Sequence, residues 1–248
     1  MPADRPPTLQ LQVATPDASA APALPGRPYP PPAGREATWP AQLTVLGAIA
    51  LQVALPDRLE VGPHWLVPSL EGLLLLGLAL ATPRQLEHEH THRRVVALGL
   101  IALVSAANIY SLGALAHFLL HHNITNGREL IGAGVLIWLT NVLIFALWYW
   151  QLDRGGPANR ARHPDPTSAE GRPDFVFPEM DSGAPYTPPD WTPGFVDYLA
   201  LAVSTATAFS PADTMPISQR AKILMSAQAL ISLVTLGLII SRAVGILG

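Results

Sequence analysis

Long apolar runs separated by polar links constrain this chain more than any other feature. There are five such runs, at residues 39–55, 64–82, 95–120, 129–151 and 217–247. A helix needs about 20 mostly apolar residues to cross the hydrocarbon core of a bilayer. The first run is the shortest, and the last continues for 31 residues without interruption. The pattern predicts an all-α, polytopic membrane protein with about five transmembrane helices.

The composition agrees with a membrane protein and excludes several functional classes. Of the 248 residues, 49% are hydrophobic and 13% are charged, against about 25% charged in an ordinary soluble domain. The net charge is -3 and the basic residues form no block, which argues against nucleic-acid binding. The absence of cysteine excludes disulfides and thiolate metal sites. Without a phosphate loop or a zincin motif, we predict no enzyme activity and no cofactor; the bilayer is the expected partner.

Proline and glycine divide the chain into four regions. Residues 1–40 are rich in proline and alanine, lack the apolar core of a signal peptide and predict a disordered tail. Residues 41–151 hold four predicted transmembrane helices. Residues 152–191 contain "DRGGP" from Asp153 on and predict a polar linker, in which "FVFPEM" lies on the membrane surface or packs against the protein. Residues 192–248 form the last region.

The last region combines a short apolar helix with a polar loop. In "TPGFVDYLALAVSTA", Thr192 is suited to cap a helix and Pro193 to occupy its first position, but the helix is too short to cross a membrane. The hydroxyl-rich stretch "VSTATAFSPADTMP" follows, and then the last run. Irregular backbone is tolerated at membrane depth only where it is buried in protein or lines a watery cavity. This order predicts a re-entrant half-helix whose backbone carbonyls face ions.

Residues 198–247 resemble the pore helix, selectivity filter and inner helix of the potassium-channel superfamily. The stretch "NVLIFALWYWQLDRGGP" is also similar to one that recurs in an uncharacterised family of bacterial polytopic membrane proteins with a channel-like C-terminal module. The resemblance implies a homotetramer in the bacterial inner membrane that conducts monovalent cations. It aligns residues 198–204 with the pore helix and the following six with the filter: Thr205, Ala206, Thr207, Ala208, Phe209 and Ser210.

This sequence departs from the channel pattern at the filter. Ala208 and Ser210 replace the two filter glycines, which allow the backbone to aim successive carbonyls inward, so potassium selectivity is not implied. Asp213 lies near the filter-flanking aspartate of the family, but two residues away, because Pro211 occupies that column.

Polar residues inside the apolar runs are further candidates. Glu71 is an intramembrane acid, and it either serves a functional site or reaches a headgroup or a partner. Asn108 and Asn141 either join helices by hydrogen bonds or contribute to permeation. Gln228 forms a stripe with Ser226, Ser232 and Thr235 that either lines a wet cavity or packs helices.

Three histidines alternate with other residues in "EHEHTHRR". In an extended strand, His88, His90 and His92 would share one face, which predicts a zinc or nickel site, with the solvated loop as the alternative. A non-conducting sensor or scaffold, with a degenerate pore module and this histidine-rich loop responding to metal or pH, is therefore the second functional hypothesis.

The distribution of basic residues bears on orientation. With five spans, twelve of the fifteen lie on the side of the N-terminus and the re-entrant loop. The positive-inside rule then places that side in the cytoplasm, whereas potassium-channel filters open outward. The short loops alone give three basic residues against two, so the orientation stays open.

Overall fold

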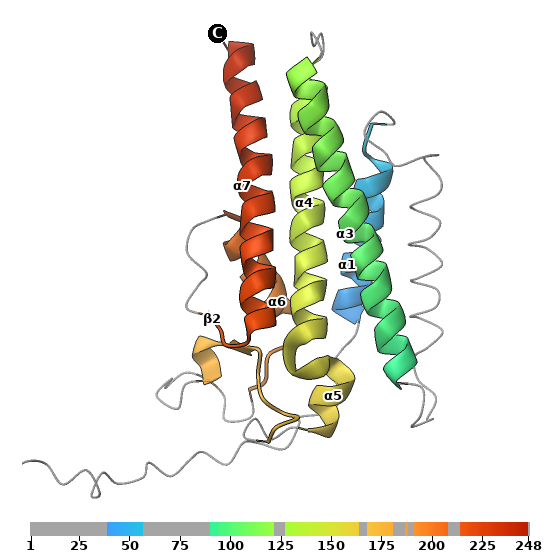
Figure 1. Cartoon of the computed structure of the whole chain (residues 1–248), viewed down its shortest axis with the longest axis vertical. Coiled ribbons are helices and arrows are strands. Elements are labelled where there is room, and N and C mark those ends of the chain that lie inside the picture. The colour runs from blue at the N-terminus through green and yellow to red at the C-terminus, as the bar shows by residue number, and fades with distance from the viewer. Residues whose placement is uncertain are drawn as a thin grey trace, which may run out of the picture.

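The computed structural model describes residues 39–56, 90–121, 127–163, 168–180, 187, 191–207 and 214–247. Most of these residues are helical. The longer elements are α1 (Trp39–Val53), α3 (His90–His121), α4 (Gly127–Leu152) and α7 (Gln219–Leu247), which run along the long axis of the molecule (Figure 1). Helix α6 (Phe195–Thr207) is about half as long as α4 and packs against both α4 and α7.

Short elements close one end of the bundle. They are the 3-10 turn η2 (Asp153–Gly155), helix α5 (Pro157–Arg162), strand β1 (Phe175–Val176), the 3-10 turn η3 (Pro178–Met180) and strand β2 (Met215–Pro216). The two strands pair antiparallel, with Phe175 opposite Pro216 and Val176 opposite Met215. We call this the α5 end of the bundle; α4 begins at the opposite end (Figure 1).

Helices α3, α4 and α7 are long and apolar enough to cross a membrane. They confirm three of the five predicted spans as helices of sufficient length. Helix α1 has 15 residues, which reach about 22 Å at 1.5 Å per residue and fall short of a hydrocarbon core of about 30 Å. The predicted span at 64–82 lies outside the described residues. The coarse prediction of a helical membrane protein therefore holds.

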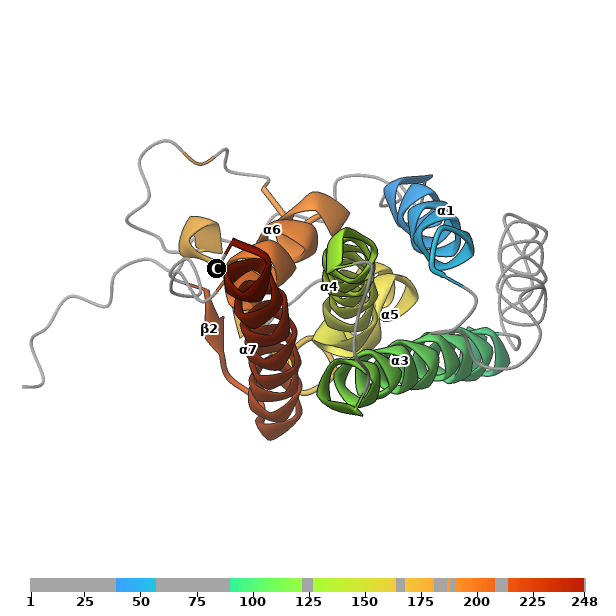
Figure 2. The ribbon, with the colours of Figure 1, turned by 90° about the horizontal axis from the view of Figure 1, so that it is seen from above.

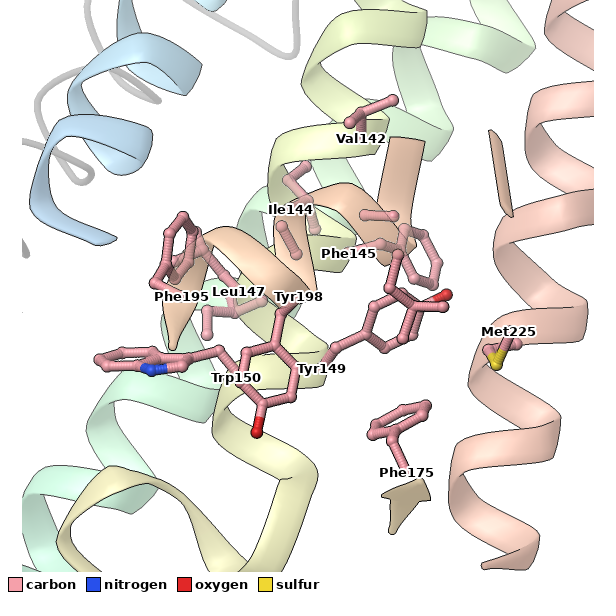
Figure 3. Close-up of a cluster of buried hydrophobic side chains, with 14 of the residues drawn as sticks. Val142, Ile144, Phe145, Leu147, Tyr149, Trp150, Phe175, Phe195, Tyr198 and Met225 are labelled. Atoms are coloured by element: carbon pink, nitrogen blue, oxygen red, sulfur yellow. The ribbon is translucent and has the colours of Figure 1, made fainter. Parts of the chain in front are cut away.

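Helix α4 is the centre of the fold. Viewed from above, it lies between α1 and α3 on one side and α6 and α7 on the other (Figure 2). Its second half is buried on most sides, because it is apolar around its whole circumference. Aromatic rings from distant segments pack on it: Tyr149 contacts Phe175 at 5.1 Å between ring centroids, and Trp150 contacts Phe195 at 5.8 Å (Figure 3).

A glycine permits the close approach of α4 and α7. A Cβ atom added at Gly134 would lie 2.6 Å from Cγ1 of Ile239. Real Cβ atoms do not approach neighbours so closely, so any larger residue would push the two helices apart. The α4–α7 seam is therefore set by the absence of a side chain at this position.

Core contacts fix the directions of the helices. At the start of α1, Ala41 lines an apolar cavity together with Trp150, near the end of α4. At the other end of α1, Leu55 packs in a cluster with Leu112 and Leu130. Helices α1 and α3 therefore both run away from the α5 end, whereas α4 runs toward it (Figure 1).

Three consecutive left-handed residues end α4. The φ angles are 50° at Arg154, 76° at Gly155 and 91° at Gly156. Glycine adopts such angles without a Cβ clash, and Pro157 then begins α5. The interpretation of "DRGGP" as a helix break agrees with this turn.

The region predicted as a polar linker contains core residues. In "FVFPEM", Phe175 is fully buried and Phe177 is 4% exposed. Of the two interpretations of this island, the structure supports packing against the protein. The apolar side chains need burial, and the chain returns to the bundle because β1 pairs with β2.

Candidate functional site at the half-helix α6

Helix α6 has one apolar face and a polar C-terminal turn. Its buried residues are Phe195, Tyr198, Leu201, Ala202, Thr205 and Ala206, and their spacing places them on the side that meets α4 and α7. At the start, Asp197 Oδ2 accepts a 2.7 Å hydrogen bond from the Gly194 N–H, and the Asp197 N–H donates to Gly194 O. The helix therefore begins at Phe195, two residues after the predicted first position at Pro193.

Contacts with two tryptophans of α4 define the path of α6. Phe195, at its start, lies against Trp150, and the carbonyl of Ala206, at its end, accepts a 3.4 Å hydrogen bond from Trp138 Nε1. Twelve residues of α4 separate these tryptophans, which corresponds to about 18 Å along the helix. Helix α6 thus begins at the α5 end and stops near the middle of α4.

The chain then returns to the end from which it came. Thr207 ends α6, and seven residues later Thr214 precedes β2, which pairs with β1 at the α5 end. Seven residues reach about 25 Å at most, which is enough to return along the length of α6. Helix α6 and β2 therefore begin at the same end of the bundle, which is compatible with the predicted re-entrant path.

Asp153 ties the start of α6 to the turn after α4. The side chain is fully buried. Its Oδ1 accepts hydrogen bonds from the backbone N–H groups of Asp174 (2.7 Å) and Phe175 (3.3 Å), and its Oδ2 accepts one of 2.7 Å from the Tyr198 hydroxyl. Arg154 Nε lies 4.0 Å from Oδ2. One carboxylate thus joins α4, β1 and α6, and these donors offset the cost of burying it.

Arg160 covers the end of α4. Its Nη1 donates hydrogen bonds to the carbonyls of Trp150 (2.8 Å), in the last turn of α4, and Asp153 (2.9 Å), which also accepts one from the Gly156 N–H. Its guanidinium also lies 5.4 Å from the ring centroid of Tyr198, within range of a cation–π contact. Tyr198 is therefore held by its hydroxyl and by its ring face.

Asp174 connects the same turn to α7. Its Oδ2 accepts a 3.1 Å bond from the Arg154 N–H, its carbonyl accepts a 2.8 Å bond from the Ile217 N–H, and its Oδ1 lies 3.8 Å from Arg220. Helices α4, α6 and α7 are thus linked at the α5 end by two buried carboxylates.

Gln228 of α7 anchors the middle of α6. It is fully buried; its Nε2 donates a 2.8 Å hydrogen bond to Ala202 O, and its Oε1 accepts one from the Tyr149 hydroxyl. Further along the seam, Asn141 Nδ2 donates a 3.0 Å bond to Ser232 Oγ. These partners lie within one protomer, between α4, α6 and α7. The structure therefore places Gln228, Ser232 and Thr235 of the predicted stripe in helix packing, whereas Ser226 is exposed.

The structure describes half of the predicted filter. Thr205, Ala206 and Thr207 belong to α6, so the prediction that the pore helix ends at Ser204 is wrong by three residues. The Thr205 hydroxyl donates a 2.8 Å hydrogen bond to Leu201 O, and the Thr207 hydroxyl donates one of 3.0 Å to Val203 O. Both hydroxyls thus bond to carbonyls of the preceding helical turn. Ala208, Phe209, Ser210 and Asp213 lie outside the described residues.

The remaining predicted residues are scattered. Asn108 is buried on α3, away from α6. The backbone at His90 and His92 is helical, so the extended strand is wrong for these positions. Residues two apart in a helix do not share a face. The helix extends to these histidines from the apolar run that follows them. His88 and Glu71 lie outside the described residues. Within the described ranges, no group of three or more His, Cys, Asp or Glu side chains is placed to hold a metal ion.

Comparisons with protein-family models, curated proteins and solved structures gave no match. The resemblance to potassium channels therefore remains a hypothesis that depends on the residues quoted for it.

Sequence reasoning missed the residues that position α6. Asp153, Arg160, Asp174 and Tyr198 were not predicted. A weak signal existed, because an acid directly after an apolar run, before two glycines, needs partners if the turn folds back on the bundle. Their identity required the tertiary structure, since the backbone partners of Asp153, at Asp174 just before β1 and at Phe175 in β1, lie 21 and 22 residues away.

Proposed function

We propose that this chain is an ion-channel-like protein of the bacterial inner membrane, in which α4, α6 and α7 form a pore module. Four copies would assemble around one axis, and monovalent cations would pass the loop that follows α6. The observation that carries the proposal is the re-entrant path of α6, whose C-terminal end stops near the middle of α4, held there by Trp138.

The direction of α6 favours cations. The C-terminal end of a helix carries about half a negative charge, because its last carbonyls have no partners within the helix. At the middle of a bilayer, little water screens that charge, and broken helices in transporters use such ends to hold cations. A half-helix that begins at the membrane surface and ends at mid-depth thus points the favourable end toward a cation.

The helix directions support a multi-pass topology. Helices α1 and α3 both run away from the α5 end, α4 runs toward it, and α7 runs away from it (Figure 1). Helices α3, α4 and α7 are long enough to cross a membrane, and crossings beyond these three stay a prediction.

A non-conducting scaffold is the second candidate, favoured by one observation. Gln228, Ser232 and Thr235 of α7 are buried inside the protomer. The exposed face of the same helix is mostly apolar, with Ile223, Leu230 and Leu233 each at least 63% exposed, and Ser226 and Ser241 as exposed polar residues. A pore lined by this face would be dry, and the module would then serve only to assemble copies of the chain.

Cation flux into liposomes containing the purified protein separates the two candidates. Wild-type protein should conduct, and Trp138→Phe, which removes the N–H that holds the end of α6, should reduce flux several-fold. Trp148→Phe is the matched control, because its Nε1 donates to Ser105 of α3 instead. A tetramer that shows no cation flux would contradict the channel and support the scaffold. A protein that is monomeric in lipid would contradict both candidates.

A further inference from the structure

The α5 end of the bundle exposes four cations. Arg162 ends α5, Arg172 precedes β1, and Arg220 and Lys222 lie in the first turn of α7; all four are exposed. Hydrogen bonds gather these segments: Asn159 of α5 donates to Glu170 O, and Ile217 donates to Asp174 O. The four cations therefore lie on one end of the molecule, where α4 ends and α7 begins (Figure 1).

The carboxylates of the same end are divided between core and surface. Asp153 and Asp174 are buried and accept hydrogen bonds from N–H groups of the protein, and Asp153 accepts one from Tyr198 as well. Glu170 and Glu179 are exposed. Among the described side chains exposed on this end, four cations thus stand beside two carboxylates, and one of the cations, Arg220, also lies 3.8 Å from the buried Asp174.

Exposed apolar residues accompany the cations. Met215 is 64% exposed and Ile217 is 48% exposed, directly before the α7 turn that carries Arg220 and Lys222. Trp39 begins α1 at the same end and is 60% exposed. Tryptophan at a helix end is typical of the membrane–water interface, and apolar side chains beside lysine and arginine are typical of segments that lie in the headgroup layer.

We propose that the α5 end is a docking surface for anionic phospholipid headgroups of the cytoplasmic leaflet. Arg162, Arg172, Arg220 and Lys222 bind the phosphates, while Trp39, Met215 and Ile217 insert among the first carbons of the acyl chains. The positive-inside rule and the negative charge of the cytoplasmic leaflet favour this side. The half-helix α6 then begins on the cytoplasmic side, opposite to the orientation of potassium-channel filters. The inference is independent of conduction and goes beyond it.

Lipid titration tests the charge of the surface. Detergent-solubilised protein is titrated with phosphatidylglycerol or phosphatidylcholine, and bound lipids are counted by native mass spectrometry alongside the thermal midpoint. We expect preferential binding of phosphatidylglycerol. Each cation near an anionic surface contributes about five-fold, so Arg162→Gln, Arg172→Gln and Lys222→Gln together should weaken binding on the order of 100-fold.

Arg128→Gln is the matched control, since Arg128 is an exposed cation at the opposite end of α4. It should keep the wild-type preference for phosphatidylglycerol. Equal binding of the two lipids by the wild-type protein, or an equal loss in the control and the triple variant, would overturn the proposal. A triple variant that keeps the wild-type midpoint without lipid shows that the loss is not a folding defect.

Orientation gives a second, separate measurement, because the chain contains no cysteine. Single cysteines are introduced as Glu170→Cys at the α5 end and Arg128→Cys at the opposite end. A membrane-impermeant maleimide should label the Arg128→Cys variant in intact cells, and the Glu170→Cys variant only after the cells are opened. Labelling of the Glu170→Cys variant in intact cells would contradict a cytoplasmic α5 end.

Discussion

The hydroxyl of Tyr198 in α6 donates a 2.7 Å hydrogen bond to Oδ2 of Asp153, and both residues are fully buried. Asp153 lies directly after α4, which is long and apolar enough to cross a membrane, and Tyr198 lies in the first turns of the half-helix. This bond fixes the point at which α6 begins, and the Trp138 contact fixes the depth at which it ends. The position of the proposed pore loop depends on both.

Tyr198→Phe tests the hydrogen bond between Tyr198 and Asp153. Loss of the hydroxyl leaves Asp153 with one donor fewer, and a hydrogen bond to a charged group contributes about 1.5–3 kcal/mol. We expect a lower thermal midpoint of the detergent-solubilised protein, by about 3–12 °C for a chain of this size. Tyr110→Phe, at an exposed position on α3, should leave the midpoint unchanged. Equal midpoints for the two variants would refute a structural role for the Tyr198 hydroxyl.

Gly134→Ala should separate α4 from α7. The added methyl group would lie 2.6 Å from Ile239, and overpacking a tight helix contact costs about 1–3 kcal/mol. Gly132→Ala is the control, because nothing lies within 4 Å of a Cβ at that position. Resistance to unfolding by denaturing detergent measures the difference. A Gly134→Ala protein as resistant as the control would mean that α7 can shift freely along α4.

Gln228 and Tyr149 should be energetically coupled. Gln228→Met removes the acceptor of the Tyr149 hydroxyl, and Tyr149→Phe removes the donor. Hydrogen bonds between membrane helices contribute about 0.6 kcal/mol on average and at most about 1.7 kcal/mol, so the coupling energy should fall in this range. A double-mutant cycle of the free energy of unfolding measures it. Strict additivity of the two substitutions would show that the bond does not stabilise the seam.

Gly156→Ala should destabilise the turn after α4. The φ angle of 91° is unfavourable for alanine, and the new Cβ would lie 3.0 Å from Gln151 Oε1 and 3.3 Å from Gln151 O. We expect a loss of at least about 1 kcal/mol. Gly113→Ala, in an open stretch of α3 with nothing within 4 Å, should instead raise stability slightly, because alanine favours the helix. The sign of the change in thermal midpoint distinguishes the two sites.

Local sequence determined the elements that depend on the summed hydropathy of neighbouring residues. Apolar runs of sufficient length gave α3, α4 and α7, because the cost of placing a segment in a bilayer depends on its own composition. The two glycines after Arg154 ended α4, and the short apolar stretch before the hydroxyl-rich loop predicted a half-helix. None of these features requires a distant partner.

The tertiary structure decided which polar groups serve packing. The stripe of Gln228, Ser232 and Thr235 has the same pattern whether it faces water or α4, and only its bonds to residues 26, 79 and 91 positions away resolve the choice. The end of α6 lies three residues beyond its predicted position for the same reason, because the Ala206 carbonyl accepts a hydrogen bond from Trp138, 68 residues earlier. Hydropathy is a property of a segment, whereas a buried hydrogen bond belongs to two segments that meet only after folding.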